Sequence, residues 1–204
     1  ATAVGYLAGY SAQGTETIAV GYFAGHTSQG TSAVAMGREA ARYNQSSYCV
    51  AVGNEAGKTS QNNEGVGIGR RAGRYNQGAY GVAIGGIAGQ LNQGNGSIAI
   101  GRDAGNSNQG SHAIAIGQRA GLYNQHANSI VLNATGSALN TGGTSRFYVK
   151  PIRLNSGALS WASSSGEIYA NTSDDRVKHN ETYIKNALRT IMKLKPQTYD
   201  KSPD

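Results

Sequence analysis

The chain has 204 residues, of which 38% are hydrophobic and 30 are glycine, so large apolar side chains are scarcer than in most globular domains. The single Cys49 excludes an intrachain disulfide, and no apolar run reaches the roughly 18 residues of a membrane span. The net charge of +7 comes from scattered residues, with no basic cluster longer than Arg70-Arg71. We therefore expect no nucleic-acid partner and no membrane insertion.

A 16-residue repeat runs through residues 1–133, and because the chain begins inside this pattern we expect it to be a fragment of a longer protein. The unit reads approximately [IV]-A-[IV]-G-x-x-A-G-x-x-N-Q-G, followed by three variable residues. Its glycine column is Gly5, Gly21, Gly37, Gly53, Gly69, Gly85, Gly101 and Gly117. Its glutamine column is Gln13, Gln29, Gln45, Gln61, Gln77, Gln93, Gln109 and Gln125.

Such a unit is too short for a pair of helices, whereas aliphatic residues on both sides of a small one, bounded by glycines, are typical of a strand between turns. The sequence therefore predicts a mainly β fold, a parallel β-roll or solenoid with 16-residue coils stacked about 4.8 Å apart. Each coil offers only two large aliphatic side chains. We expect several rolls to associate and to bury a second face through the small alanine and glycine columns.

The glutamine column allows two interpretations. Stacked amides can hydrogen-bond along the rod as a structural ladder, or a row of amides can bind sugar hydroxyls. An identical residue in every copy suits a structural register better than a local site, so we favour the ladder.

The strand motif, which recurs as VAIG, SIAIG and AIAIG, resembles the head repeats of trimeric autotransporter adhesins. The resemblance covers about residues 1–133. It implies a left-handed parallel β-roll, three of which pack about a threefold axis as a homotrimer, with an adhesive surface.

A candidate ligand stripe lies five residues after the column glycines, at Arg42, Lys58 and Arg74, with Tyr43 and Tyr75 beside two of them. Such residues can bind a glycan through charge-assisted hydrogen bonds and ring stacking. The alternative is a solvated turn with long polar side chains. The histidines of the repeat, at His26, His112 and His126, fall in different columns, so we expect no metal site and no cofactor.

Residues 134–172 hold short apolar runs separated by Gly, Ser and Asn, which predicts an irregular β-rich neck. The segment SIVLNATGSALN followed by FYVKPIR is similar to the region before the C-terminal processing domain of bacteriophage and large-virus fibre proteins. In residues 173–204, the stretch YIKNALRTIMKL has helical period and predicts a short C-terminal helix that ends before Pro196.

The pattern S-D-x-R-x-K before this helix resembles the start of the intramolecular chaperone auto-processing domain of phage tailspikes and endosialidases. The resemblance implies C-terminal trimerisation and one self-cleavage at the Thr172–Ser173 bond, with Ser173 as nucleophile and Lys178 as general base. A neutral lysine can activate a serine in this way. The chain would then be at most a single-turnover serine endopeptidase acting on itself. The alternative is that SDDRVK is merely a polar helix entry.

Together these features predict a rod (1–133), a neck (134–172) and the N-terminal part of a self-cleaving chaperone domain (173–204). The favoured function is an adhesive homotrimeric fibre of the viral or phage tail-fibre type, located on the virion or as an extracellular fibre, with a host-surface glycan or protein receptor. One alternative is a bacterial trimeric adhesin fibre, a cell-surface appendage. The other is a glycan-degrading tailspike, for which the carboxylates Glu39 and Glu55 lie one coil apart on a turn.

Overall fold

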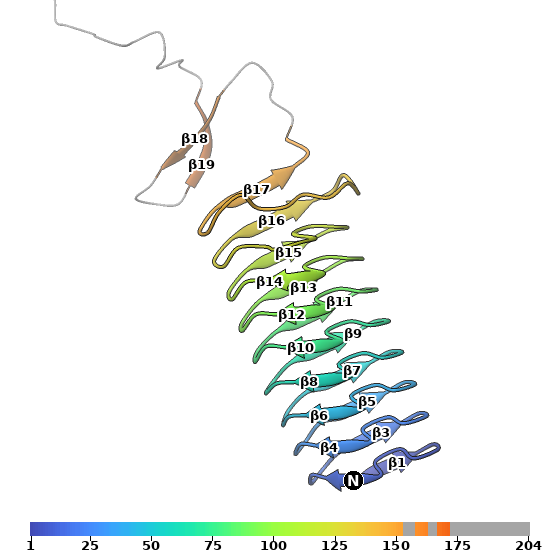
Figure 1. Ribbon diagram of the computed structural model, residues 1–204. Coiled ribbons are helices and arrows are strands. Elements are labelled where there is room, and N and C mark those ends of the chain that lie inside the picture. Colours follow the sequence, from blue (N-terminus) through green and yellow to red (C-terminus); the bar gives the residue numbers. More distant parts are fainter. Residues whose placement is uncertain (153–157, 163–166, 172–204) are drawn as a thin grey trace, which may run out of the picture. The chain divides into compact units, whose positions relative to one another are not determined.

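The computed structural model describes residues 1–152, 158–162 and 167–171 (Figure 1). The chain divides into two units, Ala1–Ile152 and Arg153–Asp204. The first unit is a parallel β-solenoid, which confirms the predicted mainly β roll. The predicted C-terminal helix and the residues Thr172, Ser173 and Lys178 lie outside the described residues. In the part of the chain that the structure describes, no helix is long and apolar enough to cross a membrane.

Two parallel sheets form the walls of the solenoid. The ten-stranded sheet runs in the order β1-β3-β5-β7-β9-β11-β13-β15-β16-β17. Its strands are β1 (Thr2–Val4), β3 (Ile18–Val20), β5 (Val34–Met36), β7 (Val50–Val52), β9 (Val66–Ile68), β11 (Val82–Ile84), β13 (Ile98–Ile100), β15 (Ile114–Ile116), β16 (Ile130–Asn133) and β17 (Phe147–Lys150).

The seven-stranded sheet runs in the order β14-β12-β10-β8-β6-β4-β2. Its strands are β2 (Ser11–Gln13), β4 (Thr27–Gln29), β6 (Tyr43–Gln45), β8 (Thr59–Gln61), β10 (Tyr75–Gln77), β12 (Leu91–Gln93) and β14 (Ser107–Gln109). Paired residues of neighbouring strands are one repeat apart in sequence, as Ile98 and Ile114 are, so the repeat length equals one coil. Residues at equivalent places in successive coils therefore stack as columns along the rod.

The column glycines lie in the turn that follows each strand of the ten-stranded sheet from β1 to β15. Gly53 has φ +131°, and a Cβ on it would lie 2.6 Å from the carbonyl oxygen of Gly69 in the next coil. A side chain at this position meets both an unfavourable backbone conformation and the neighbouring backbone. The tight stacking of coils therefore requires glycine at these turns.

The core of the roll consists of alanine and glutamine. The middle residues of the ten-stranded sheet's strands from β3 to β15 face inward and are mostly alanines, as Ala35, Ala51 and Ala99 are with 0% exposure. The aliphatic residues on either side face outward, and Ile84 and Ile100 are each 36% exposed. The expectation that the alanine and glycine columns form the contact face between rolls is wrong, because the alanine columns are buried inside the roll, as Ala40 and Ala56 are with 0% exposure.

The roll continues for one strand after the periodic sequence ends. Strand β17 pairs in parallel with β16, and Ile130 lies opposite Phe147, so this last coil is one residue longer than the repeat. Asn133 stands where earlier coils have glycine, and its amide nitrogen donates to the carbonyl oxygens of Gln118 at 2.8 Å and Ser137 at 2.6 Å. These bonds hold the last, irregular coil against the regular ones.

In the second unit the structure describes one hairpin. Strands β18 (Ala158–Ala162) and β19 (Glu167–Asn171) pair antiparallel, with Ser160 opposite Tyr169.

Candidate functional site

The glutamine column lies inside the roll. The seven glutamines from Gln29 to Gln125 are 0–3% exposed. Their amide nitrogens donate to the backbone carbonyl oxygen of the residue eleven positions earlier, at 2.8 to 3.0 Å. Each such bond spans the interior from one sheet to the other. Side chains buried to this degree are out of reach of a sugar on the surface.

Side-chain to side-chain bonds along the glutamine column occur at two steps, Gln45 to Gln61 and Gln109 to Gln125, both at 3.1 Å. In most coils the second amide proton is instead directed to the carbonyl oxygen four residues later, as in Gln61 to Gly65 at 2.9 Å. The glutamines therefore brace each coil internally and link neighbouring coils only in places.

An exposed asparagine ladder runs along the neighbouring column of the seven-stranded sheet, and the sequence interpretation missed it. Asn76 donates to Asn92 at 3.0 Å, Asn92 to Asn108 at 2.9 Å, and Asn108 to Asn124 at 3.0 Å. These residues have φ between 49° and 55°, a conformation that asparagine tolerates better than most residues. The repeated Asn-Gln pair was the available signal.

The cations of the candidate ligand stripe belong to an ion-pair network that crosses coils. Lys58 Nζ lies 2.7 Å from an oxygen of Glu39 and 2.9 Å from one of Glu55. Arg42 pairs with Glu39 at 3.3 Å, and Arg74 pairs with Glu55 at 2.9 Å. The side chains of Glu39 and Glu55 are only 8% and 10% exposed. The network thus fixes three coils to one another at their turns.

The ion pairs shift the pKa values of both acids downward. Burial opposes ionisation of Glu55, but hydrogen bonds from Lys58 and Arg71 and the charge of Arg74 outweigh it and lower its pKa from 4.5 to about 2. A hydrogen bond from Lys58 likewise lowers the pKa of Glu39, against its burial. Burial lowers the affinity of Lys58 for its proton, yet the two carboxylates raise its pKa above 10.5. The general acid of a glycosidase has a raised pKa, whereas the pKa values of Glu39 and Glu55 are both lowered.

Aromatic rings cover the guanidinium groups of the stripe. Arg42 Cζ lies 4.5 Å from the ring centre of Phe23 and 4.9 Å from that of Tyr43, and Arg74 Cζ lies 4.6 Å from that of Tyr75. The Nε atoms of Arg42 and Arg74 are buried without a hydrogen-bond partner. The stripe residues therefore lie in adjacent coils at one turn, where Arg42, Lys58 and Arg74 each pair with a glutamate.

Stacked aromatic side chains lie in the first two coils, at the same turn as the candidate ligand stripe. The rings of Tyr6 and Tyr22 stack with centres 5.5 Å apart, and those of Tyr10 and His26 stack at 5.2 Å. Phe23 makes edge contacts with both Tyr6 and Tyr22. Tyr6 is 64% exposed, so these rings form a surface platform.

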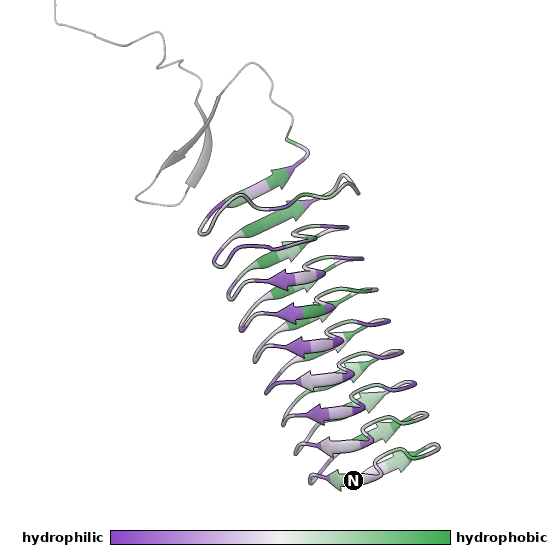
Figure 2. Cartoon of the chain, in the orientation of Figure 1, coloured by the Kyte–Doolittle hydropathy of each residue, from purple (hydrophilic) through white to green (hydrophobic). Residues whose placement is uncertain are grey.

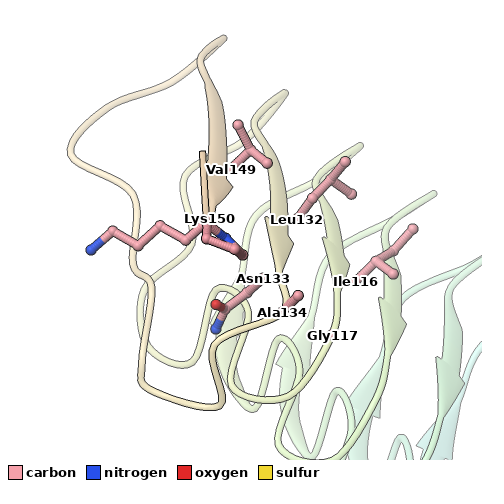
Figure 3. A pocket seen from close by; sticks show the side chains of 8 residues that line it. Ile116, Gly117, Leu132, Asn133, Ala134, Val149 and Lys150 are labelled. Carbon is pink, nitrogen blue, oxygen red and sulfur yellow. The ribbon is translucent and has the colours of Figure 1, made fainter. Parts of the chain in front are cut away.

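The outer side of the ten-stranded sheet is an apolar surface. We call it the aliphatic face, and it consists of the first and third residues of this sheet's strands from β3 to β16. Figure 2 shows this sheet mostly in green tones and several strands of the seven-stranded sheet in purple. A hollow at the end of the face is lined by Ile116, Leu132 and Val149, which come from three successive strands, with Gly117 and Lys150 at its border (Figure 3).

Two of the histidines, His26 and His126, contact hydroxyl groups. His26 Nδ1 lies 2.8 Å from Thr27 Oγ1, and His126 Nδ1 lies 2.8 Å from Thr141 Oγ1. No group of three His, Cys, Asp or Glu side chains that could hold a metal ion occurs among the described residues. Comparisons with models of protein families, with curated proteins and with solved structures found no match for the chain.

Proposed function

We propose that this chain forms the rod of a homotrimeric adhesive fibre, of the viral or phage tail-fibre type, that attaches to a host surface. The observation that carries the proposal is the aliphatic face. The face is continuous from β3 to β16, and each of its isoleucines at positions 18, 68, 84, 100, 116 and 130 is 36–40% exposed. Monomeric soluble proteins rarely expose a contiguous apolar surface of this extent, and such surfaces mark protein interfaces.

The interior of a single roll makes association necessary for stability. Its hydrophobic core clusters consist of alanines, apart from Val131 at the last coil. An alanine removes far less apolar area from water than isoleucine or valine, whose full burial contributes about 1.5–3 kcal/mol. Packing three aliphatic faces about a common axis buries the large side chains that the roll itself leaves outside. The polar seven-stranded sheet and the charged turns then form the outer surface.

A trimeric rod of this kind suits attachment outside the cell. Its coils are joined by short, ordered turns, and its outer columns vary in chemistry while the inner columns keep alanine, glycine and glutamine. The fibre would lie on a virion or on another extracellular appendage, and its partner would be a host-surface glycan or protein receptor. A bacterial trimeric adhesin fibre would use the same interface.

The proposal includes maturation by one self-cleavage before Ser173, with Lys178 as the base that takes the serine proton. It rests on the sequence pattern, since these residues lie outside the described ones. The full-length Ser173→Ala chain should remain unshortened on a denaturing gel after assembly, and Ser165→Ala serves as the control. A Ser173→Ala chain that is shortened like the parent would contradict the assignment.

The trimer itself is tested by replacing outward isoleucines. The triple variant Ile84→Ser, Ile100→Ser, Ile116→Ser should lower the solution mass from three chains to one while the β signal in circular dichroism persists. The matched control replaces Asn76, Asn92 and Asn108 by Ser on the other sheet and should remain trimeric. A trimeric isoleucine variant would refute this interface.

A further inference from the structure

The repeat gathers the cations of the roll at one turn. Residues 1–152 contain ten Lys and Arg residues, and eight of them lie in the connections that directly follow strands of the ten-stranded sheet. These eight are Arg38, Arg42, Lys58, Arg70, Arg71, Arg74, Arg102 and Arg119. The same connections hold three carboxylates, Glu39, Glu55 and Asp103, so the net charge of this edge is +5 (8 − 3). The opposite turn of coils 1–8 carries Glu16 and Glu64 and neither Lys nor Arg.

In one column of these connections, the hydrogen-bond donors of the side chains face solvent. It starts with two tyrosines and then carries an arginine in every second coil, and we call it the arginine–tyrosine row. Its members are Tyr6, Tyr22, Arg38, Asn54, Arg70, Gly86, Arg102 and Gln118. The side chains of Arg38 and Arg102 are 59% and 61% exposed, and Arg70 is exposed as well.

Each ion pair of this row occupies only part of its guanidinium group. Arg38 pairs with Glu39 through Nη2 at 3.0 Å, and Arg102 pairs with Asp103 through Nε at 3.6 Å. The guanidinium groups are exposed, although the side chains of Glu39 and Asp103 are only 8% and 20% exposed. Each guanidinium has five N–H donors in a planar fork, so most of them are available to a ligand. The cations of the neighbouring stripe, Arg42, Lys58 and Arg74, are instead 16–25% exposed and face Glu39 and Glu55.

The row has a fixed spacing. Arg38, Arg70 and Arg102 lie in every second coil, so successive arginines are about 9–10 Å apart at the usual distance between strands. Asn54 lies between the first two arginines, and Gly86 lies between the last two. At the start of the row, Arg38 Cζ lies 6.0 Å from the ring centre of Tyr22, which in turn stacks on Tyr6.

We propose that the arginine–tyrosine row binds a linear acidic polysaccharide that carries one carboxylate on every second sugar. Two pyranose rings in an extended chain span a distance similar to two coils, so successive carboxylates meet successive arginines. Each guanidinium can bind a carboxylate with two parallel hydrogen bonds. Asn54 lies where a sugar hydroxyl would pass, and the stacked faces of Tyr6 and Tyr22 suit an uncharged sugar ring. The inference rests on the proposed attachment to a host surface and names the class of glycan.

The charge spacing distinguishes this ligand from a nucleic acid. Duplex DNA carries one negative charge per roughly 1.7 Å of its axis, far denser than one arginine per two coils. A polyanion of that density would be matched by cations in adjacent coils, whereas Asn54, Gly86 and Gln118 interrupt this row.

Binding of the full chain to hyaluronan, which has one carboxylate per disaccharide, tests the proposal, with neutral dextran and single-stranded DNA as comparison ligands. The variant Arg70→Gln, Arg102→Gln should bind hyaluronan at least about tenfold more weakly. The control Arg146→Gln, Lys150→Gln removes two exposed charges outside the row and should bind like the parent. The proposal is overturned if the control variant loses as much affinity for hyaluronan as the arginine variant. It is also overturned if the parent binds dextran or single-stranded DNA at least as tightly as hyaluronan.

A change of spacing gives a second, independent test. The variant Asn54→Arg, Gly86→Arg, Gln118→Arg puts an arginine in every coil from Arg38 onward, and a Cβ on Gly86 meets no atom within 4 Å. Polygalacturonate has a carboxylate on every sugar, so the affinity of this variant for polygalacturonate should rise relative to its affinity for hyaluronan. An unchanged ratio of the two affinities contradicts the proposed match between carboxylate spacing and arginine spacing. Solution mass is measured on the same samples. A trimer that does not bind hyaluronan refutes this inference alone, whereas a monomer refutes the proposed fibre.

Discussion

The side-chain amide of Gln61 donates a 2.9 Å hydrogen bond to the backbone carbonyl oxygen of Val50, across the interior of the roll. The same amide reaches Gly65 O at 2.9 Å, so one side chain satisfies two buried acceptors. Replacing Gln61 by Ala removes both bonds and leaves the carbonyls without this donor, so we expect the free energy of unfolding to fall by at least about 2 kcal/mol. Urea denaturation measures the change.

Gln118→Ala is the matched control for this variant, because Gln118 is partly exposed at a turn outside the glutamine column. Its effect should stay within about 0.5 kcal/mol. Equal losses for the two variants would show that the buried amide has no special part in stability.

The column glycines should be irreplaceable, in contrast to Gly86. In Gly53→Ala the new methyl group would meet Gly69 O at 2.6 Å on a backbone with φ +131°. We expect a loss of about 3 kcal/mol or more, or failure to fold. Gly86→Ala places its methyl group in open space and should be neutral or slightly stabilising. Thermal melting of both variants tests this difference in stability. If Gly53→Ala melts at a temperature close to the parent's, the column glycines are not required for coil stacking.

Ile87 occupies a conformation that suits asparagine better. Its φ is 67°, which is strongly disfavoured for a β-branched residue. The variant Ile87→Asn should raise the free energy of unfolding by about 1 kcal/mol, because asparagine tolerates the left-handed region. Ile87→Val keeps the β-branched side chain and should bring no gain. If Val stabilises as much as Asn, backbone strain is not the cause.

The ion-pair network should make the roll sensitive to acid. Glu55 has a pKa of about 2 in the folded chain and an ordinary pKa near 4.5 when unfolded. Between these values the unfolded state binds more protons, so stability should fall as the pH falls from about 4.5 to about 2. Above the unfolded pKa the contribution of Glu55 is fully present.

Melting temperatures across this pH range test the network. Glu55→Gln should melt at a lower temperature than the parent at neutral pH and lose less stability on acidification. Glu64→Gln, on the exposed opposite turn, should follow the parent's curve. A parent-like acid response in Glu55→Gln would mean that other groups govern acid unfolding.

The coil length and the parallel sheets could be predicted from the sequence, because glycine and glutamine recur at one constant interval. The direction of the side chains could not. A strand such as Ile98-Ala99-Ile100 fits either an aliphatic or an alanine interior, since a shift of one residue exchanges the two faces. In the structure Ala99 faces the interior with 0% exposure, whereas Ile100 faces outward and is 36% exposed.

The ion-pair network could not be predicted for a similar reason, whereas the arginine–tyrosine row could have been found by aligning the repeats. Glu39 and Lys58 belong to different coils and to different columns, yet they lie 2.7 Å apart at the turn. Arg38, Arg70 and Arg102 look scattered along the chain, although they belong to one column. Charge along the sequence therefore gives a poor guide to charge on the surface of a solenoid.

The mass of the full chain in solution, measured by sedimentation equilibrium, tests the central claim most directly. The account predicts a species of three times 21.1 kDa at micromolar concentration, because the alanine core leaves the aliphatic face to be covered by two further copies. A folded species of 21.1 kDa that persists as the concentration rises would contradict it.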